Sequence, residues 1–370
     1  MSTLLSQIAI VYNEPEASRY DSTGEAKAVL GVLDSVKAVD ESLRELGYSV
    51  TSLPLSLPLE EAKEKLKRLG VDLVFNLFEG FCGYPETEAM VPETLSELGI
   101  PYTGCRGNII RLCLDKAKVK VFLQAAGIPT PDAQLLTPQT LGTFQLAYPC
   151  IVKPCGEDAS HGLTGDSVVS DFASLKKQVR VISESYGGRA LVEKFLDGRE
   201  YSATIMGKSQ YSVLPVSEMV YALPPGMSRI LTFAAKWEPD SLYFQGTTTV
   251  CPAEIKAEEE ERIASTALAV IRLIGCRGYA RVGMRADSEG RINVIEVNPN
   301  PDISPGTGVA RQSTAAGMTY TQFIDKIIQI ALEKESDDNQ HPPIGKEGQA
   351  RSDADTAEYS RVQTGGGGRC

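Results

Sequence analysis

The sequence predicts an α/β domain followed by α+β domains, and three observations support this fold class. The 370 residues are 42% hydrophobic and 23% charged, which provides enough apolar material for two or three packed cores. Residues 1–104 alternate short apolar runs with amphipathic helical patterns, as in a parallel sheet covered by helices. Later residues give consecutive strand patterns separated by turns, which indicates α+β architecture.

The N-terminal domain is expected to span residues 1–104 and to form an open parallel sheet. QIAIVY (7–12) is a continuous apolar run with the length of a buried strand. A helix follows, because apolar residues recur at steps of four and three until Gly47 ends the pattern. The elements expected next are a strand at 48–55, a helix at 60–70, a strand at 72–77 and a helix at 85–98.

The central domain is expected over 105–203 and the C-terminal domain over 204–335. The central elements are a helix within 115–131, strands at 133–137, 148–154 and 189–196, a helix at 171–185, and paired strands at 198–207 and 210–219. The C-terminal elements are a turn-rich polar segment at 223–245, a strand at 247–255, a helix at 256–274, strands at 278–286 and 292–298, a loop at 298–312 and a helix at 319–332.

The end of the chain, residues 336–370, is expected to be disordered. This stretch is polar and contains a four-glycine run. It cannot bury enough apolar surface to offset the entropy lost on ordering.

The charge balance argues against nucleic acid or an anionic membrane as the main partner. Lys and Arg total 37 and Asp and Glu total 48, so the formal net charge is −11. No stretch approaches the roughly 18 apolar residues of a membrane span. The N-terminus lacks the basic segment of a signal peptide, so a cytoplasmic location is expected.

Histidine and cysteine usage narrows the chemistry. Only His161 and His341 occur, which argues against histidine-based triads and against metal sites built from several imidazoles. The eight cysteines form no CxxC motif, so zinc modules and a disulfide framework are not expected. Buried reduced thiols are the interpretation for all of them except Cys155 and Cys370.

Glu296 and Asn298 form a candidate metal site. Positions i and i+2 of a strand face the same side, so their oxygen atoms converge. Two hard oxygen donors suit Mg²⁺, which takes few protein ligands and shares its octahedron with phosphate oxygens. A strand end with solvated polar groups explains the pair equally well.

A candidate phosphate site combines Lys153 with the glycine-bearing loop 155–166. The loop contains three glycines and Ser160. Glycines let backbone N–H groups approach a phosphate, and the lysine provides a point charge. The Walker A motif is absent. A flexible surface loop is the alternative.

Three further charged residues are candidates. Glu193 and Glu200 flank a turn between two strands, where a carboxylate could hold a ribose or an adenine amino group. Acidic residues that lie in turns and contact only solvent are just as common as acidic residues that bind a ligand. Arg281 lies on an otherwise apolar strand and needs an anionic partner, which is either a structural carboxylate or a substrate oxyanion.

In their order along the chain, these pieces resemble the ATP-grasp superfamily, and particularly its D-alanine–D-alanine ligase branch. The similarity rests on DKAK with AGIPTP (115–131), IVKP with the glycine loop, LVEKFLDGRE (191–200) and ARV with VIEVNPNP, and covers roughly residues 6–333. The resemblance implies a three-domain ATP-grasp architecture. It also implies an ATP-dependent ligase that joins a carboxylate to an amine through an acyl phosphate. Dimers are usual in that family, so a homodimer is an expectation.

The resemblance also implies roles for individual residues. Those expected to bind ATP are Lys116, Lys153 and Lys236 at the phosphates, Glu193 and the backbone around Leu196 at adenine, and Glu200 at the ribose. Those expected to act in catalysis are Arg281 at the developing oxyanion, Lys236 and Ser160. Those expected to bind Mg²⁺ (or Mn²⁺) are Glu296 and Asn298.

The chain departs from the family pattern mainly where substrates would bind. Glu79 replaces a histidine, Trp237 replaces a tyrosine, and Asp302 stands near the expected carboxylate of the second substrate. With Thr307, these residues are the predicted substrate contacts. A carboxylate at Asp302 would repel a substrate carboxylate by roughly 1 kcal/mol or more, so an acceptor with a free amine or a cationic group fits better.

Three departures affect the remaining roles. The loop serine of the family corresponds to Ala159, although Ser160 follows it. Gly283 occupies the position of a metal-binding aspartate, which could weaken one Mg²⁺ site unless water and Asp302 compensate for the loss. The glutamate that holds the first substrate has no clear counterpart, and Glu25 and Asp34 are the nearest acids.

The sequence therefore predicts a small-molecule ligase with an altered substrate pocket. An authentic D-alanine–D-alanine ligase of peptidoglycan synthesis and a catalytically weak nucleotide-binding protein are the alternatives, and a kinase is a weaker one.

Overall fold

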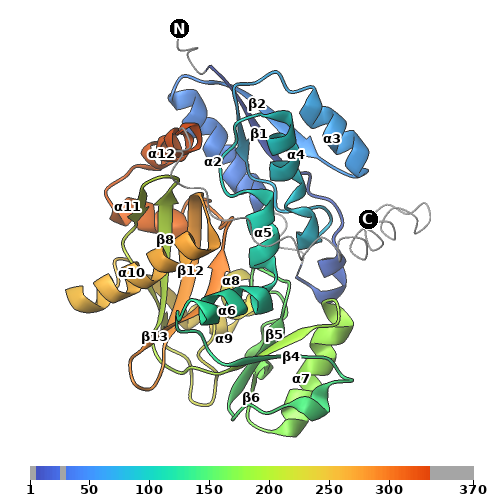
Figure 1. The fold of residues 1–370 in the computed structure, drawn as a ribbon, viewed down its shortest axis with the longest axis vertical. Helices are drawn as coiled ribbons and strands as arrows, with labels where there is room; N and C mark the ends of the chain where they lie inside the picture. The colour runs from blue at the N-terminus through green and yellow to red at the C-terminus, as the bar shows by residue number, and fades with distance from the viewer. Residues whose placement is uncertain (1–5, 26–30, 334–370) are drawn as a thin grey trace.

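The computed structural model describes residues 6–25 and 31–333 and divides their strands among three sheets. Figure 1 shows the N-terminal sheet at the top, the central sheet at the lower right and the C-terminal sheet at the left. The α/β and α+β fold class with a parallel N-terminal sheet is confirmed. The predicted disordered tail over 336–370, with His341 and Cys370, lies outside the described residues.

The N-terminal sheet is parallel and follows the predicted alternation of strand and helix. Its strands are β1 (Gln7–Asn13), β2 (Ser49–Leu55) and β3 (Leu73–Asn76), in the order β2-β1-β3. The helices are α2 (Val32–Glu45), α3 (Leu59–Lys67) and α4 (Met90–Leu98). The predicted helix at 85–98 is divided, because Pro85–Thr87 forms a separate 3₁₀ turn, η2. The Thr87 hydroxyl donates to the Tyr84 carbonyl at 2.6 Å. Such a bond from a side chain to the backbone competes with the backbone hydrogen bonds of a continuous helix.

A pair of helices connects the N-terminal sheet to the rest of the molecule. These are α5 (Gly107–Leu114), which was not predicted, and α6 (Lys116–Ala125). Asp115 separates them: its backbone is not helical, and its side chain accepts a hydrogen bond from the Lys118 N–H to cap α6. The helix predicted within 115–131 therefore ends at Ala125, two residues before Gly127, which has a φ of 69°.

The central sheet is antiparallel and small. Its strands are β4 (Ala133–Leu136), β5 (Cys150–Pro154), β6 (Val168–Val169) and β7 (Ala190–Lys194), in the order β4-β7-β5-β6. Helix α7 (Phe172–Ser185) contributes Leu175, Val179 and Ile182 to the core that this sheet encloses. Short 3₁₀ turns occur at Leu141–Thr143 (η3) and Gly165–Ser167 (η4).

The C-terminal sheet has six strands. They are β8 (Glu200–Gly207), β9 (Tyr211–Val213), β10 (Ser217–Tyr221), β11 (Thr247–Val250), β12 (Gly278–Ala286) and β13 (Ile292–Asn298). The order is β11-β10-β8-β12-β13, with β9 also paired to β8. The single strand predicted at 210–219 is divided into β9 and β10. Pro215 lies in the segment between them and has no N–H to donate to a sheet.

The segments around the C-terminal sheet contain both confirmed and corrected predictions. The predicted helices at 256–274 and 319–332 are confirmed as α10 (Ala257–Ile274) and α12 (Tyr320–Leu332). The loop expected over 298–312 is wrong at its end, because α11 (Gly308–Ala315) begins within it. The polar segment 223–245 contains two short helices that were not predicted, α8 (Phe233–Trp237) and α9 (Leu242–Gln245).

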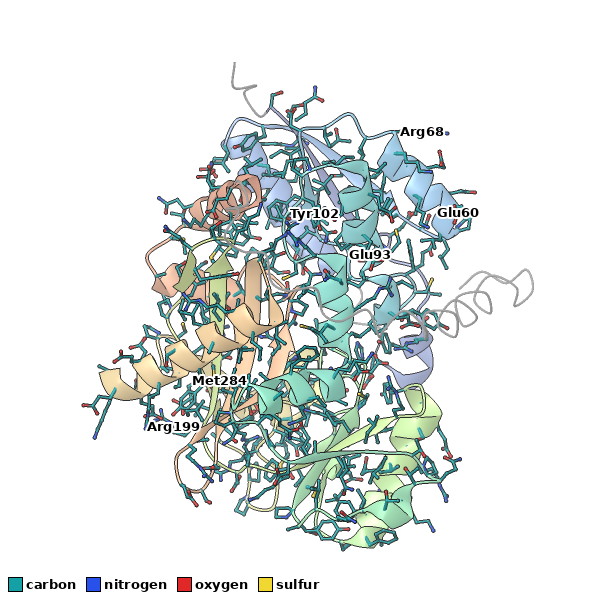
Figure 2. The ribbon with its side chains drawn as sticks, viewed as in Figure 1. Glu60, Arg68, Glu93, Tyr102, Arg199 and Met284 are labelled. Atoms are coloured by element: carbon teal, nitrogen blue, oxygen red, sulfur yellow. The ribbon has the colours of Figure 1, made fainter. Side chains whose placement is uncertain are left out.

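The largest core joins elements on both sides of the predicted domain limits. Ile109 of α5 and Leu123 of α6 pack in one cluster with Ile263 of α10 and Met284 of β12, and Met284 is fully buried. Figure 2 shows Met284 in the part of the molecule that contains the C-terminal sheet, and Tyr102 where this part meets the N-terminal domain. Strand β8 runs across residue 203. The limits at 104, 203 and 335 themselves remain predictions.

Candidate functional site

The centre of the site is a buried carboxylate held by two lysines. Glu193 lies on β7 and is 1% exposed. Its oxygens lie 2.6 Å from Lys153 Nζ at the end of β5 and 2.7 Å from Lys120 Nζ on α6. Burial raises the pKa of Glu193, but Lys153 and Lys120 outweigh it and lower that pKa below its usual value. Lys153 and Glu193 are thus together, as predicted. Lys120 was missed, although its position four residues after Lys116 on one helix face is a signal.

Lys116 connects α6 to the glycine loop 155–166. Its Nζ donates to the backbone carbonyl of Glu157 and lies 3.5 Å from the Asp158 carboxylate. Burial lowers the pKa of Lys116, but Asp158 and Glu296 raise it more, so the lysine stays charged. The predicted lysine and the predicted loop therefore form one unit.

Arg281, Glu296 and Asn298 lie side by side where β12 and β13 pair. Arg281 is opposite Asn298, and Gly283 is opposite Glu296. The Arg281 guanidinium is 3.7 Å from the Glu296 carboxylate. Burial raises the pKa of Glu296, but Arg281 and three lysines lower it overall; the lysines are Lys116, Lys236 and Lys153. Cations from α6, β5, α8 and β12 thus lie near enough to one carboxylate of β13 to lower its pKa.

Lys236 approaches this carboxylate from α8. Burial and the nearby Arg281 lower the pKa of Lys236 to about 8, against the opposing effect of Glu296. The next residue, Trp237, packs at a tilt against Phe233, with ring centroids 6.2 Å apart. Its indole N–H is buried and has no hydrogen-bond partner among the described residues. Because its pKa is lowered to about 8, Lys236 is a cation whose charge is sensitive to pH near neutrality.

Glu296 and Asn298 provide a donor set that fits Mg²⁺. The Asn298 Oδ1 accepts one hydrogen bond, from the Asn300 N–H at 2.9 Å, and retains a lone pair. Within the described ranges, no three His, Cys, Asp or Glu side chains are grouped in a way that could hold a metal. A single carboxylate and an amide suit a Mg²⁺ ion that keeps water and phosphate oxygens as its other ligands.

The residues predicted to hold adenine and ribose border this cluster. The Glu200 carboxylate accepts from the Tyr221 hydroxyl at 2.8 Å and pairs with Arg285 at 3.2 Å. The Arg285 guanidinium carbon lies 5.0 Å from the centroid of the Phe195 ring. Phe195 directly precedes the buried Leu196 in the sequence. Arg285 was not predicted. The roles of Glu193, Leu196 and Glu200 toward a nucleotide remain predictions.

Two acids occur at the predicted substrate side. The Asp302 Oδ1 accepts from the Ser304 N–H at 2.8 Å and from the Ser304 hydroxyl at 2.7 Å. Part of the Glu79 residue is exposed to solvent. Desolvation by the surrounding protein, together with Asp302 and Asp158, raises the pKa of its carboxyl group to about 8. In the part of the chain that the structure describes, no basic side chain pairs with either carboxylate within 4 Å.

Thr307 and Ser160 complete the predicted set. The Thr307 hydroxyl donates to the Ser304 carbonyl at 2.7 Å, just before α11. Ser160 lies in the glycine loop with a φ of 64°, a left-handed conformation that is uncommon for residues with a side chain. Their contacts to a substrate remain predictions.

Glu25, one of two acids considered for the first substrate, is buried and already bound. It pairs with His161 Nδ1 at 2.8 Å and accepts from the Tyr186 hydroxyl at 2.9 Å and from the Gly162 N–H at 3.2 Å. No local pattern in the sequence indicated this contact between Glu25 and His161, because the two residues are far apart along the chain.

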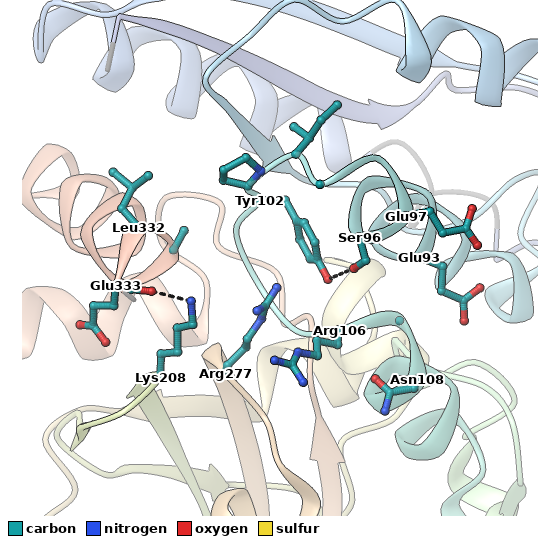
Figure 3. A pocket seen from close by; sticks show the side chains of 15 residues that line it. Glu93, Ser96, Glu97, Tyr102, Arg106, Asn108, Lys208, Arg277, Leu332 and Glu333 are labelled. Atoms are coloured by element: carbon teal, nitrogen blue, oxygen red, sulfur yellow. Dashed lines mark hydrogen bonds between the residues drawn. The ribbon is translucent and has the colours of Figure 1, made fainter. Parts of the chain in front are cut away.

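A separate pocket of about 790 Å³ lies away from this cluster. Figure 3 shows Arg106 and Arg277 in it, with the Tyr102 hydroxyl bonded to Ser96 and Lys208 bonded to the Glu333 backbone. None of the predicted site residues lines it.

Comparison with known proteins identifies the family. Residues 122–329, more than half of the chain, match the family described as D-ala D-ala ligase C-terminus. The chain belongs to this family. The predicted D-alanine–D-alanine ligase-like ATP-grasp family and enzyme class, an ATP-dependent ligase that forms C–N bonds, are confirmed.

Relatives in other organisms match most of the chain. The uncharacterized protein y4sG of Sinorhizobium fredii is 34% identical over 70% of this chain and 74% of its own. A D-alanine–D-alanine ligase of Actinobacillus pleuropneumoniae is 28% identical over 81% of this chain and 92% of its own.

Solved structures have the same fold. D-alanine–D-alanine ligase of Bacillus anthracis complexed with ATP has a TM-score of 0.68 at 24% identity, covering 88% of this chain and 97% of its own. The VanG D-Ala:D-Ser ligase of Enterococcus faecalis has a TM-score of 0.70 at 20% identity, covering 89% and 100%. At these identities the similarity establishes the fold alone.

Two expectations about the whole chain can be compared with the described residues. Within them, no helix combines the length and apolar character needed to cross a membrane. Six cysteines have free thiols, and five of these are buried; the six are Cys105, Cys113, Cys150, Cys155, Cys251 and Cys276. Cys82 is disulfide-bonded, so the interpretation of a reduced thiol is wrong for this residue.

Proposed function

We propose that this chain is an ATP-dependent carboxylate–amine ligase that acts through an acyl phosphate and uses substrates other than two D-alanines. The observation that supports this most is the convergence of Arg281 and three lysines on Glu296. Lys153 is also paired with Glu193 and Lys116 with Asp158, but Lys120 and Lys236 bring the cations of the cluster to five against three carboxylates. This excess of positive charge suits a triphosphate. The ATP complex of the Bacillus anthracis ligase supports ATP as the nucleotide.

The nucleotide would lie between the central and C-terminal sheets. Lys116, Lys153 and Lys236 would contact its phosphates. Glu193 and the backbone at Leu196 would hold adenine, and Glu200, already oriented by Tyr221, would hold the ribose. Glu296 and Asn298 would hold Mg²⁺ or Mn²⁺, which when bound neutralises and orients the phosphate oxygens.

The reaction would proceed in two transfers. An oxygen of the first substrate's carboxylate attacks the γ-phosphorus, and ADP leaves with the electron pair of the broken P–O bond. The amine nitrogen of the second substrate then attacks the acyl carbon, phosphate leaves, and the nitrogen loses a proton. Arg281 stabilises the tetrahedral oxyanion and Ser160 orients the first substrate, so catalysis is positioning plus electrostatic stabilisation.

Two segments would exclude water from the acyl phosphate. The glycine loop 155–166 contacts Lys116, and segment 223–245 includes the helix with Lys236. Closure of both over the site would protect the intermediate from hydrolysis.

The acceptor is proposed to bring a cationic group or a free amine without a neighbouring carboxylate. Burial and the nearby Asp302 raise the pKa of Glu79 to about 8, so Glu79 is mostly protonated at neutral pH and Asp302 provides the negative charge that a second substrate would meet. Trp237 and Thr307 would line the same pocket. A carboxylate-bearing acceptor such as D-alanine is disfavoured there by like charge.

The test is a panel assay with the purified protein. Phosphate release and product mass are measured with ATP, Mg²⁺, amino-acid donors and acceptors that include D-alanine, D-serine, D-alanine amide and diamines. The proposal expects turnover with cationic acceptors and little with D-alanine. A homodimer, which is also part of the proposal, is tested by light scattering of the same sample.

The other outcomes identify the alternatives. Robust formation of the D-alanine dimer would establish an authentic D-alanine–D-alanine ligase. Mg²⁺-dependent ATP binding without turnover would indicate a nucleotide-binding protein with weak catalysis, which Gly283 favours. A phosphorylated product without a new C–N bond would indicate a kinase.

A further inference from the structure

A short segment of the N-terminal domain reaches across to the glycine loop 155–166. This segment is the 3₁₀ helix η1 (Arg19–Thr23), which begins with a capping box. The Tyr20 ring stacks on the His161 ring with a centroid distance of 3.8 Å and an interplanar angle of 4°. The Tyr20 hydroxyl donates to the Glu157 carboxylate, and Arg19 pairs with the same carboxylate. One residue, Tyr20, therefore contacts two parts of the loop.

Glu25, two residues after η1, adds a second connection. Its carboxylate binds His161, Gly162 and Tyr186, and it is 7% exposed. These three partners leave it little capacity to hold a substrate amine. Its position instead secures the loop, because the Gly162 N–H is a backbone group of the loop itself.

The loop in turn contacts the two helices that carry Lys116 and Lys236. The backbone carbonyl of Glu157 accepts from Lys116, and the Leu163 carbonyl accepts from the Phe233 N–H at 3.0 Å, at the start of α8. Between these contacts, Ala159 and Ser160 have φ values of 51° and 64°. Such backbone conformations persist where surrounding contacts hold them in place.

We infer that Tyr20 and Glu25 are positioning residues that hold the glycine loop against Lys116 and α8 and so prepare the site for the nucleotide. The inference goes beyond the proposed function and depends on it only for the identity of the nucleotide. It makes the N-terminal domain a part of the nucleotide site without a direct contact to ATP.

The experiment compares wild-type protein with Tyr20→Phe and Tyr20→Ala. Phenylalanine keeps the stacking on His161 and removes the hydroxyl group, which donates to Glu157 and accepts from Arg19 at 3.2 Å; alanine removes the stacking as well. Lys177→Ala is the matched control, because it breaks the exposed 2.9 Å pair with Asp166 at the end of the same loop. Amide hydrogen exchange of 155–166 is measured without nucleotide, and the KM for ATP and kcat are measured with a working acceptor.

The expected result is a graded release of the loop. Exchange in 157–163 should rise about tenfold in Tyr20→Phe, as for loss of one hydrogen bond to a charged group, and further in Tyr20→Ala. The KM for ATP should rise with it while kcat changes less. Fluorescence of Trp237, the single tryptophan, should report the change in α8. Lys177→Ala should match the wild type in all of these.

Three results would overturn the inference. They are unchanged exchange in 157–163 in Tyr20→Ala, a KM for ATP that does not move, and a rise in exchange spread evenly over the N-terminal domain, which would mean a structural role only. Failure of the proposed function is distinguishable: wild-type protein would then form no new C–N bond with the cationic acceptors, while the exchange comparison without nucleotide would still test the positioning role.

Discussion

Gly283 lies directly opposite Glu296 in the antiparallel pair of β12 and β13, and a Cβ atom added there would lie 3.5 Å from the Glu296 Cβ. The same added atom would be 3.8 Å from the Glu296 Oε2, at ordinary van der Waals distance. A side chain at this position is therefore sterically accommodated and would be directed toward the candidate metal ligand. The strand has the space for a second carboxylate but does not provide one.

Gly283→Asp should strengthen metal binding. The new carboxylate would repel Glu296 by about 1 to 4 kcal/mol, depending on the local dielectric, and a divalent cation would relieve this repulsion. We expect tighter Mn²⁺ binding in the presence of ADP, measured by calorimetry, and lower stability without metal. Gly283→Asn, of equal size and without charge, is the control. Unchanged Mn²⁺ affinity in Gly283→Asp would show that this position does not face the metal.

Activity should depend on the protonation of Lys236. Because the pKa of Lys236 is lowered to about 8, the lysine loses its charge as the pH rises through that value. The kcat/KM for ATP, which reports groups of the free enzyme, should fall above about pH 8. Lys236→Arg should retain its charge and move this fall to higher pH. The exposed Lys177→Arg serves as control, and an identical profile for both variants would contradict the assignment.

Glu193→Gln should destabilise the protein by about 3 to 5 kcal/mol at neutral pH, because it leaves two buried lysines without their counter-charge. The lowered pKa of Glu193 means that its contribution is complete above the ordinary value of 4.5 and is lost as the pH falls through the lower folded value. Urea unfolding should therefore show a difference between wild type and variant that shrinks below about pH 4.5. Glu64→Gln, in an exposed pair with Lys67, should change stability little at any pH.

Asp302→Asn should change the choice of acceptor. Removing this charge should lower kcat/KM for cationic acceptors about tenfold, as for about 1.4 kcal/mol of lost attraction, and should improve use of acceptors that carry a carboxylate. The measurement is the ratio of kcat/KM for a cationic acceptor to kcat/KM for an acceptor that carries a carboxylate. Glu41→Gln, which removes an exposed charge from α2, should leave the ratio unchanged. An unchanged ratio in Asp302→Asn would place the acceptor elsewhere.

Most of the fold was predictable because its elements have strong local signals. The alternating pattern of the N-terminal domain and the periodic helices α2, α10 and α12 needed no tertiary information. The errors occurred where short elements meet polar or glycine-rich sequence. Helix α11 follows a run of prolines and glycines, and α5 is separated from α6 only by the non-helical Asp115. Short helices such as α8 depend on packing more than on propensity.

The site was predictable as a set of residue types and only partly as a set of contacts. Lys153, Glu193, Arg281 and Glu296 could be named because each lies at a strand end or on an apolar strand. Their partners could not, because an ion pair such as that of Glu193 with Lys120 joins residues far apart in the sequence.

Local patterns and the order of motifs were thus sufficient for the fold class, the family and the residues of the candidate phosphate and metal sites. Tertiary structure alone decided that Glu25 binds His161, that Tyr20 stacks on the same ring, and that Arg281 and three lysines lie near enough to Glu296 to lower its pKa. The physical reason is that secondary structure follows from neighbouring residues, whereas charge, burial and pKa depend on every group that packing brings nearby, however distant it is along the chain.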